Sequence, residues 1–197
     1  MDTNIFRFIN NLAQHSHWPD RVLVFYAKYG IVLFAVLLLL SFRNARKTNI
    51  GEVAKTIWTG SSAIVALGIA QLIGNQVNRP RPYATLDNVH LLIARTTDFS
   101  FPSDHATTVA AVAAGLLLLA DRRLGLLAGG AALAMAFSRV YAGVHYPTDV
   151  LAGLATGAIV AALGARFATP LITRLLSRLT TTPLRALVTV SRDLPTV

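Results

Sequence analysis

Two histidines and one aspartate of this chain have the residue types and the spacing for covalent chemistry. His145 and Asp149 are four positions apart, so both would lie on one face at the start of a helix, where the carboxylate orients the imidazole. An oriented, neutral imidazole is a nucleophile that can attack phosphorus. His105 comes from another part of the chain and is free to protonate a departing oxygen. These residues predict a phosphoryl-transfer site in which two histidines divide the roles of nucleophile and acid.

Arginines and a serine near these positions supply groups that bind phosphate. The guanidinium groups of Arg81 and Arg139, together with that of Arg79, offer planar pairs of N–H donors that fit phosphate oxygens. Ser103 directly precedes an apolar block, and the backbone N–H groups at a helix start attract anions. We therefore expect a phosphate site formed by Arg81, Ser103, Arg139 and Arg79.

A metal site is the main alternative interpretation of the same residues. Possible ligands are His105, His145, Asp104 and Asp149. Two histidines 40 positions apart are not a metal-binding spacing, however, several arginines would repel a divalent cation, and the chain has no cysteine. We expect neither a metal nor another cofactor. A further alternative, in which these residues only cap or anchor helices, leaves unexplained why all of them fall at one end of the expected helices.

The composition indicates which elements must position these side chains. The chain has 197 residues, of which 54% are hydrophobic and 14% charged, whereas soluble domains carry about 25% charged residues. The apolar residues form five blocks, and a membrane crossing needs about 20 such residues in a helix. The blocks are residues 22–42, 57–73, 106–120, 124–137 and 150–165. They predict an all-α integral membrane bundle of about five transmembrane helices.

Two terminal segments are expected to lie on the membrane surface. The stretch from Phe6 to Leu12 has helical periodicity but is too short to cross, so it predicts an N-terminal interfacial helix. Beyond Pro170, leucines are interspersed with Arg174 and Arg178, as in a basic amphipathic helix. The expected division is a membrane-embedded domain at residues 1–169 and a C-terminal tail at residues 170–197.

Small residues predict where helices pack closely. Gly153 and Gly157 form a small-xxx-small pair in the last block. Gly129 and Gly130, followed by two alanines, give the fourth block a narrow waist. Both features predict close contact with a neighbouring helix.

Basic residues distinguish the two ends of the expected helices. Arg43, Arg46 and Lys47 lie between the first two blocks, and Arg122 and Arg123 lie between the third and fourth. Short cytoplasmic loops are enriched in Lys and Arg, so the chemistry-bearing residues at the opposite ends are expected to face the extracytoplasmic side. The net charge of +9 comes mainly from residues that flank apolar blocks and would contact anionic lipid, so we expect no nucleic-acid partner.

Three motifs follow one another along this part of the chain. They are Asn78-Arg79-Pro80-Arg81-Pro82-Tyr83, Phe101-Pro102-Ser103-Asp104-His105, and Ser138-Arg139 followed by His145 and Asp149. In order and spacing they resemble the motifs of the type 2 phosphatidic acid phosphatase superfamily. The resemblance implies metal-independent hydrolysis through a phosphohistidine, with His145 as nucleophile, Asp149 as its orienting partner and His105 as general acid. It also implies phosphate binding by Arg81, Ser103 and Arg139.

One position departs from the family pattern. The first family motif has a lysine seven residues before the arginine that corresponds to Arg81, and this chain has Gly74 there. Lys55 cannot replace it, because it lies at the opposite end of the same expected helix. We expect Arg79 to supply the missing charge.

Two N-terminal stretches, from Phe6 to Leu12 and Phe25-Tyr26-Ala27-Lys28-Tyr29-Gly30, resemble the bacitracin-resistance type of undecaprenyl-diphosphatase. This resemblance implies hydrolysis of undecaprenyl diphosphate to undecaprenyl phosphate and inorganic phosphate at the outer face of a bacterial plasma membrane. A phosphatase of phosphatidic acid or phosphatidylglycerol phosphate is the enzymatic alternative, because the same residues would serve it. A lipid-phosphate binder or carrier without turnover is the non-enzymatic alternative. In each case the expected partners are a lipid phosphate and the bilayer.

Overall fold

The computed structural model describes residues 1–14 and 17–188, with the side chains of residues 14–20 left out. Its elements are α1 (Asp2–Asn11), η1 (Leu12–Gln14), α2 (His17–Tyr29), α3 (Ile31–Ala45), α4 (Ile50–Val77), α5 (Pro82–Thr85), α6 (Asp104–Gly115), η2 (Leu116–Ala120), α7 (Arg122–Tyr141), α8 (Pro147–Leu179) and η3 (Pro183–Leu187). All regular elements in these residues are helices, which confirms the expected all-α class.

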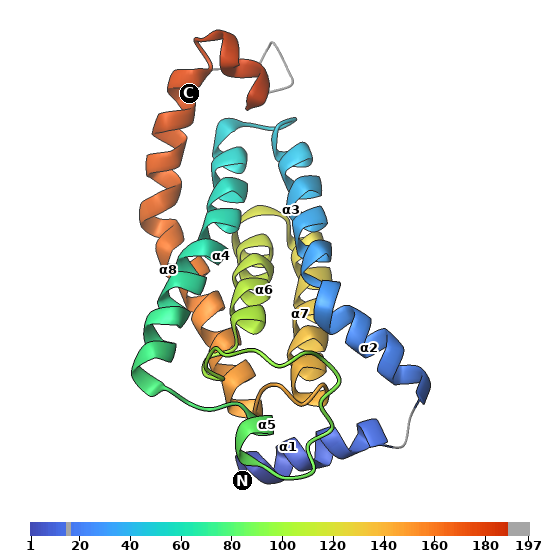
Figure 1. Ribbon diagram of the computed structural model, residues 1–197. Coiled ribbons are helices and arrows are strands. Elements are labelled where there is room, and N and C mark those ends of the chain that lie inside the picture. The colour runs from blue at the N-terminus through green and yellow to red at the C-terminus, as the bar shows by residue number, and fades with distance from the viewer. Residues whose placement is uncertain (15–16, 189–197) are drawn as a thin grey trace.

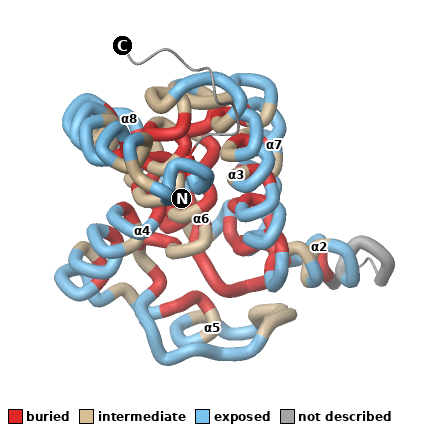
Figure 2. Tube along the Cα trace, turned by 90° about the horizontal axis from the view of Figure 1, so that it is seen from above, coloured by how far each residue is buried: buried red, intermediate tan, exposed pale blue. Residues whose placement is uncertain are grey.

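Helix α6 lies at the centre of the bundle, packed against α4, α7 and α8 (Figure 1). Most of its buried residues are small, and small residues let neighbouring backbones approach closely. Larger side chains from the surrounding elements fill the remaining space, among them Phe34, Leu116 and Met135. The buried positions accordingly gather in the middle of the bundle (Figure 2).

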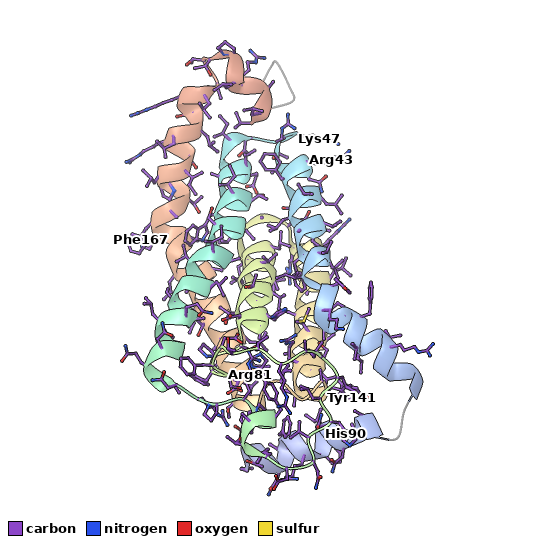
Figure 3. The ribbon with its side chains drawn as sticks, viewed as in Figure 1. Arg43, Lys47, Arg81, His90, Tyr141 and Phe167 are labelled. Atoms are coloured by element: carbon purple, nitrogen blue, oxygen red, sulfur yellow. The ribbon has the colours of Figure 1, made fainter. Side chains whose placement is uncertain are left out.

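The outer surface of the bundle carries the large apolar side chains. Ile64 on α4, Leu133 on α7 and Leu163 on α8 are all exposed. Phe167, also on α8, points away from the other helices (Figure 3). Water would oppose such a surface, whereas the hydrocarbon of a bilayer solvates it. The chain is therefore a multi-pass membrane protein.

The five expected spans are not equivalent in the structure. Ile50–Thr85, Arg122–Tyr141 and Pro147–Leu179 are each long and apolar enough to cross a membrane. The expected first span consists of two helices, which together meet the same test but bend by 55° at their junction. The remaining block, Asp104–Ala120, is shorter. Because other helices surround α6, its length need not match the thickness of the bilayer.

The bend between α2 and α3 occurs at Gly30. A Cβ at this position would lie 2.6 Å from both the ring and the carbonyl oxygen of Tyr26. The ring is held in place because the Tyr26 hydroxyl donates a hydrogen bond to the carbonyl of Ala131, at 2.7 Å. Only glycine leaves room for this contact, and it interrupts what the hydropathy alone predicts as one helix.

The glycine pair on α8 packs closely against another helix, whereas the pair on α7 does not. A Cβ at Gly157 would lie 2.2 Å from the carbonyl oxygen of Thr107, and one at Gly153 would lie 2.7 Å from that of Ser103. The close packing predicted for this pair is confirmed, and its partner is α6. By contrast, a Cβ at Gly129 or Gly130 meets nothing within 4 Å. The two glycines of the predicted waist of α7 therefore make no close contact, whereas the alanines of the same waist pack in the core.

Helix α8 continues through Pro170 to Leu179, so the helix does not stop where the tail was expected to begin. A proline removes only one backbone N–H donor, and packing beyond it can hold the helix together. Leu176 provides such packing, in a cluster with Val53, Ala54 and Val188. Residues 189–197 of the expected tail lie outside the described residues.

Candidate active site

The residues singled out for chemistry come together at one end of the bundle, which we call the polar end. It is formed by the residues that follow α4, the start of α6, the end of α7 and the start of α8, and α1 lies across it (Figure 1). Arg81 lies at this end, far from Arg43 and Lys47 at the opposite end (Figure 3). Five of the predicted site residues at the polar end are buried, namely Arg81, Ser103, Arg139, His145 and Asp149.

Helix ends explain how the backbone positions these side chains. Helix α4 ends at Asn78, which adopts a left-handed conformation with φ 51°, and Pro80 and Pro82 then keep the chain extended around Arg81. The side chain of Ser103 caps α6 by accepting the N–H of Ala106. Each motif of the sequence is thus a helix boundary.

His145 precedes α8 in a short connection and is 2% exposed. Its Nδ1 lies 2.8 Å from the carbonyl oxygen of Ser100, so Nδ1 carries the hydrogen and donates it. Nε2 then carries no hydrogen, and its lone pair accepts a hydrogen bond from Nη1 of Arg81 at 3.2 Å. This tautomer presents Nε2 as the reactive atom.

The charge state of His145 follows from its surroundings. Burial lowers the pKa of its imidazole to about 4; Asp149 opposes this shift, and the cations Arg139 and Arg81 add to it. At neutral pH the ring is uncharged, as a nucleophile must be.

Asp149 is the third residue of α8 and is fully buried. Its carboxylate accepts hydrogen bonds from the backbone N–H of Tyr146, from the hydroxyl of Ser100 and from Arg79. Its distance to Nδ1 of His145 is 3.8 Å, longer than a hydrogen bond. Asp149 therefore contacts the imidazole mainly through Ser100, which it fixes by the hydroxyl while the carbonyl of Ser100 accepts from His145.

Ser100 was not anticipated from the sequence. It lies just before the second motif, between Phe99 and Phe101, and is fully buried. Its contact with the imidazole is made by a main-chain carbonyl, which every residue has. Side-chain types and spacing therefore gave no signal for it.

Arg81 is buried with its guanidinium facing His145. In addition to Nε2 of His145, the guanidinium of Arg81 donates hydrogen bonds to the carbonyl oxygen of Val144 at 3.0 Å and to the carboxylate of Asp98 at 2.8 Å. The side chain of Asp98 is 49% exposed. Partial burial raises the pKa of Asp98, but a hydrogen bond from Thr96 and the charge of Arg81 outweigh this and hold that pKa below its usual value. An anionic group thus already occupies one face of Arg81.

Arg139, at the end of α7, has one donor engaged and another without a partner. Its Nη1 donates to the carbonyl of Ala27 on α2, at 3.1 Å. Its Nε is buried and makes no hydrogen bond within the described part of the chain. A buried, unpaired donor is costly, and a phosphate oxygen would satisfy it.

His105, the second residue of α6, lies close enough to Arg139, His145 and Arg81 to interact with their charges. The structure thus brings the two histidines and two of the predicted arginines into one site. Within the described residues, no three His, Asp or Glu side chains are placed together to hold a metal ion.

Arg79 does not join this group. Its Nη2 contacts Asp2 and its Nη1 contacts Asp149, both at 2.6 Å, and its guanidinium stacks on the ring of Tyr146 at 3.9 Å. Both terminal nitrogens are thus taken by carboxylates, whereas the sequence predicted that they would bind phosphate. The reason is α1, which brings Asp2 to the start of α8, a contact between residues far apart in sequence.

The position of the missing family lysine lines a small cavity of about 130 Å³ at this end. A Cβ at Gly74 would lie 3.0 Å from the carbonyl oxygen of Phe101. Two carboxylates, those of Asp98 and Asp104, line the same cavity, and Gln71 donates to Asp104 at 2.6 Å. No cation replaces the lysine among the residues that line this cavity.

Comparisons with known proteins agree with this geometry. Undecaprenyl-diphosphatase BcrC of Bacillus subtilis is 34% identical over 169 residues, which cover 85% of this chain and 84% of BcrC. Decaprenylphosphoryl-5-phosphoribose phosphatase of Mycobacterium tuberculosis is 44% identical over 109 residues, 53% of this chain and 56% of that protein. The crystal structure of LpxE from Aquifex aeolicus superposes with a TM-score of 0.65 at 26% identity, covering 84% of this chain and 95% of LpxE.

The family assignment rests on the segment that contains the site. Residues 55–172 match the PAP2 superfamily, and this range includes all three motifs. The resemblance seen in the sequence is confirmed: the chain belongs to the PAP2 superfamily and is a membrane-embedded lipid phosphatase.

Proposed function

We propose that this phosphatase hydrolyses undecaprenyl diphosphate to undecaprenyl phosphate and inorganic phosphate through a phosphohistidine at His145. The observation that carries the proposal is the fixed tautomer of His145, whose Nε2 carries no hydrogen and accepts a hydrogen bond from Arg81. The 34% identity with undecaprenyl-diphosphatase BcrC over most of both chains supports this substrate.

In the first step, the Nε2 lone pair of His145 forms a bond to the terminal phosphorus while the bond from that phosphorus to the bridging oxygen breaks. His105, which takes up a proton when the phosphate anion binds beside it, gives that proton to the bridging oxygen, and undecaprenyl phosphate leaves. In the second step, His105 takes a proton from a water molecule whose oxygen attacks the phosphohistidine. The N–P bond breaks, inorganic phosphate is released, and both histidines return to their starting states.

Arg81, Ser103 and Arg139 hold the phosphate oxygens during both steps. The unpaired Nε of Arg139 supports this assignment, because it needs an acceptor that the protein does not supply. Arg81 is already paired with the partly exposed carboxylate of Asp98. An incoming phosphate therefore replaces this carboxylate as the anionic partner of Arg81.

The polar end faces the outside of a bacterial inner membrane in this proposal. Arg43 and Lys47 lie at the opposite end of the bundle, where the excess of basic residues favours the cytoplasm (Figure 3). A lipid tail stays in the bilayer while its diphosphate enters the polar end, which suits the large apolar side chains exposed on the surrounding helices.

Phosphate release by the purified protein in detergent tests the proposal. Farnesyl or undecaprenyl diphosphate is compared with phosphatidic acid and phosphatidylglycerol phosphate, with EDTA present and His145→Ala as the control. We expect EDTA-resistant release that favours the prenyl diphosphate and falls at least about 10³-fold in the variant, because the nucleophile is lost. Preference for either glycerolipid would overturn the substrate, and full activity of His145→Ala would overturn the mechanism.

A further inference from the structure

The buried carboxylate of Asp149 lies closer to the guanidinium of Arg79 than to the imidazole of His145, which precedes the same helix. The Arg79–Asp149 contact measures 2.6 Å, whereas Nδ1 of His145 lies 3.8 Å away. Burying a carboxylate costs several kcal/mol unless a paired cation or several hydrogen bonds compensate for the lost water. Asp149 has both, because Tyr146 and Ser100 also donate to it.

Arg79 is in turn held by the first turn of α1. Asp2 accepts Nη2 of Arg79 at 2.6 Å, and it also accepts the backbone N–H and the hydroxyl of Thr148 at 3.1 and 2.6 Å. These hydrogen bonds and the charge of Arg79 outweigh the effect of partial burial and lower the pKa of Asp2. Two carboxylates thus share one guanidinium, and Thr148 ties the arrangement to the start of α8.

We infer that Arg79 and Asp2 are positioning residues for the phosphoryl transfer: they hold the carboxylate of Asp149 against Ser100 and so keep His145 neutral, with no hydrogen on Nε2. This inference rests on the proposed function, in which His145 is the nucleophile. It assigns Arg79 a place behind the nucleophile, whereas a phosphate ligand would lie in front of it.

The physical reason is the balance of charge around His145. Its neighbours are the cations Arg81 and Arg139, the second histidine His105, and Asp149. Without Arg79, the buried charge of Asp149 is left uncompensated, and its nearest partner is the imidazole at 3.8 Å. That charge favours the imidazolium form, whose nitrogens both carry hydrogen and which cannot attack phosphorus.

The variant Arg79→Gln tests this inference, with Arg95→Gln as a matched control. Arg95 is an exposed arginine whose guanidinium lies over the ring of Tyr83, so its loss leaves the site intact. The kcat and KM for phosphate release from farnesyl diphosphate are measured from about pH 5 to pH 8. We expect Arg79→Gln to lower kcat about tenfold near pH 5.5 and far less at pH 8, with KM changed by less than about threefold. A KM raised by about tenfold at every pH would show that Arg79 binds phosphate and would overturn the inference.

Direct observation of His145 separates this inference from the proposed function. In protein with ¹⁵N-labelled histidine, His145→Gln identifies the His145 signals, which report the tautomer and the charge without substrate. We expect the neutral Nδ1–H form near pH 6 in the unchanged protein and the charged form in Arg79→Gln. A neutral imidazole in both the unchanged protein and Arg79→Gln would contradict the inference, even if the enzyme is an active diphosphatase. The charged form in Arg79→Gln supports it, even if the natural substrate is another lipid.

The part played by Asp2 is tested by coupling. Asp2→Ala is expected to lower kcat about threefold in the unchanged background and to have no further effect in Arg79→Gln, because it acts through Arg79. Arg79→Lys keeps the charge and should restore most of the activity lost in Arg79→Gln. Independent, additive losses from Asp2→Ala and Arg79→Gln would exclude the proposed link.

Discussion

The two ends of the bundle both carry many charged residues, but they hold them differently. At the polar end Arg81 and Arg139 are buried, and their donors meet His145, Asp98 and main-chain carbonyls. At the opposite end, which we call the basic end, Arg43 in the last turn of α3 and Lys47 in the connection between α3 and α4 are both exposed (Figure 3). Burying a guanidinium costs several kcal/mol, whereas exposing one costs little. Two buried arginines are thus held in fixed positions beside His145, whereas Arg43 and Lys47 at the basic end are exposed.

Arg139→Gln gives the largest expected effect. The substitution removes one buried, preorganised donor from the phosphate, so kcat/KM for phosphate release should fall about 10²-fold. Arg43→Gln, at the basic end, is the matched control and should leave kcat/KM unchanged. Comparable losses of kcat/KM in both variants would show that the arginines of the two ends do not differ in function.

Asp98→Asn is expected to have a smaller effect in the opposite direction. Its carboxylate competes with phosphate for Arg81, so neutralising it should lower KM about threefold to tenfold. Because the pKa of Asp98 is held below its usual value, its charge is present above about pH 4 and disappears only as the pH falls through the lowered pKa. The ratio of the two KM values should therefore stay constant from about pH 5 to pH 8. A KM that rises in the variant would mean that Asp98 helps to bind the substrate.

Lys55→Ala gives the smallest expected effect. Lys55 pairs with Glu52 at 2.6 Å, but both side chains are about one-third exposed, at 38% and 31%. Such pairs contribute less than about 1 kcal/mol, so thermal unfolding in detergent and kcat/KM should both be nearly unchanged. A large loss of activity would place a functional charge at the end where we expect none.

Residue type and spacing were sufficient to predict which side chains gather at the polar end. His105, His145, Arg81 and Arg139 each have chemistry that few residue types share, and each lies at a boundary of an apolar block. The bundle class followed from hydropathy in the same way. These properties are local, so they can be read from a single sequence.

The partners of those side chains were not predictable, because they depend on contacts between distant segments. Asp2 and Arg79 are 77 positions apart, and nothing near either residue indicates the other. Ser100 acts through its carbonyl, which has no side-chain signature. Gly30 interrupts an apolar block in a way that becomes evident only when the ring of Tyr26 is seen against it.

The contact between Asp2 and the start of α8 also constrains the order in which the protein can assemble. Asp2 is 146 positions from Thr148, so this contact forms only after the last helix has entered the membrane. Contacts between such distant segments close late in folding. Until then the Arg79–Asp149 pair lacks the support of Asp2. Because His145 and Asp149 themselves lie at the start of α8, the two histidines come together only after this helix is in place.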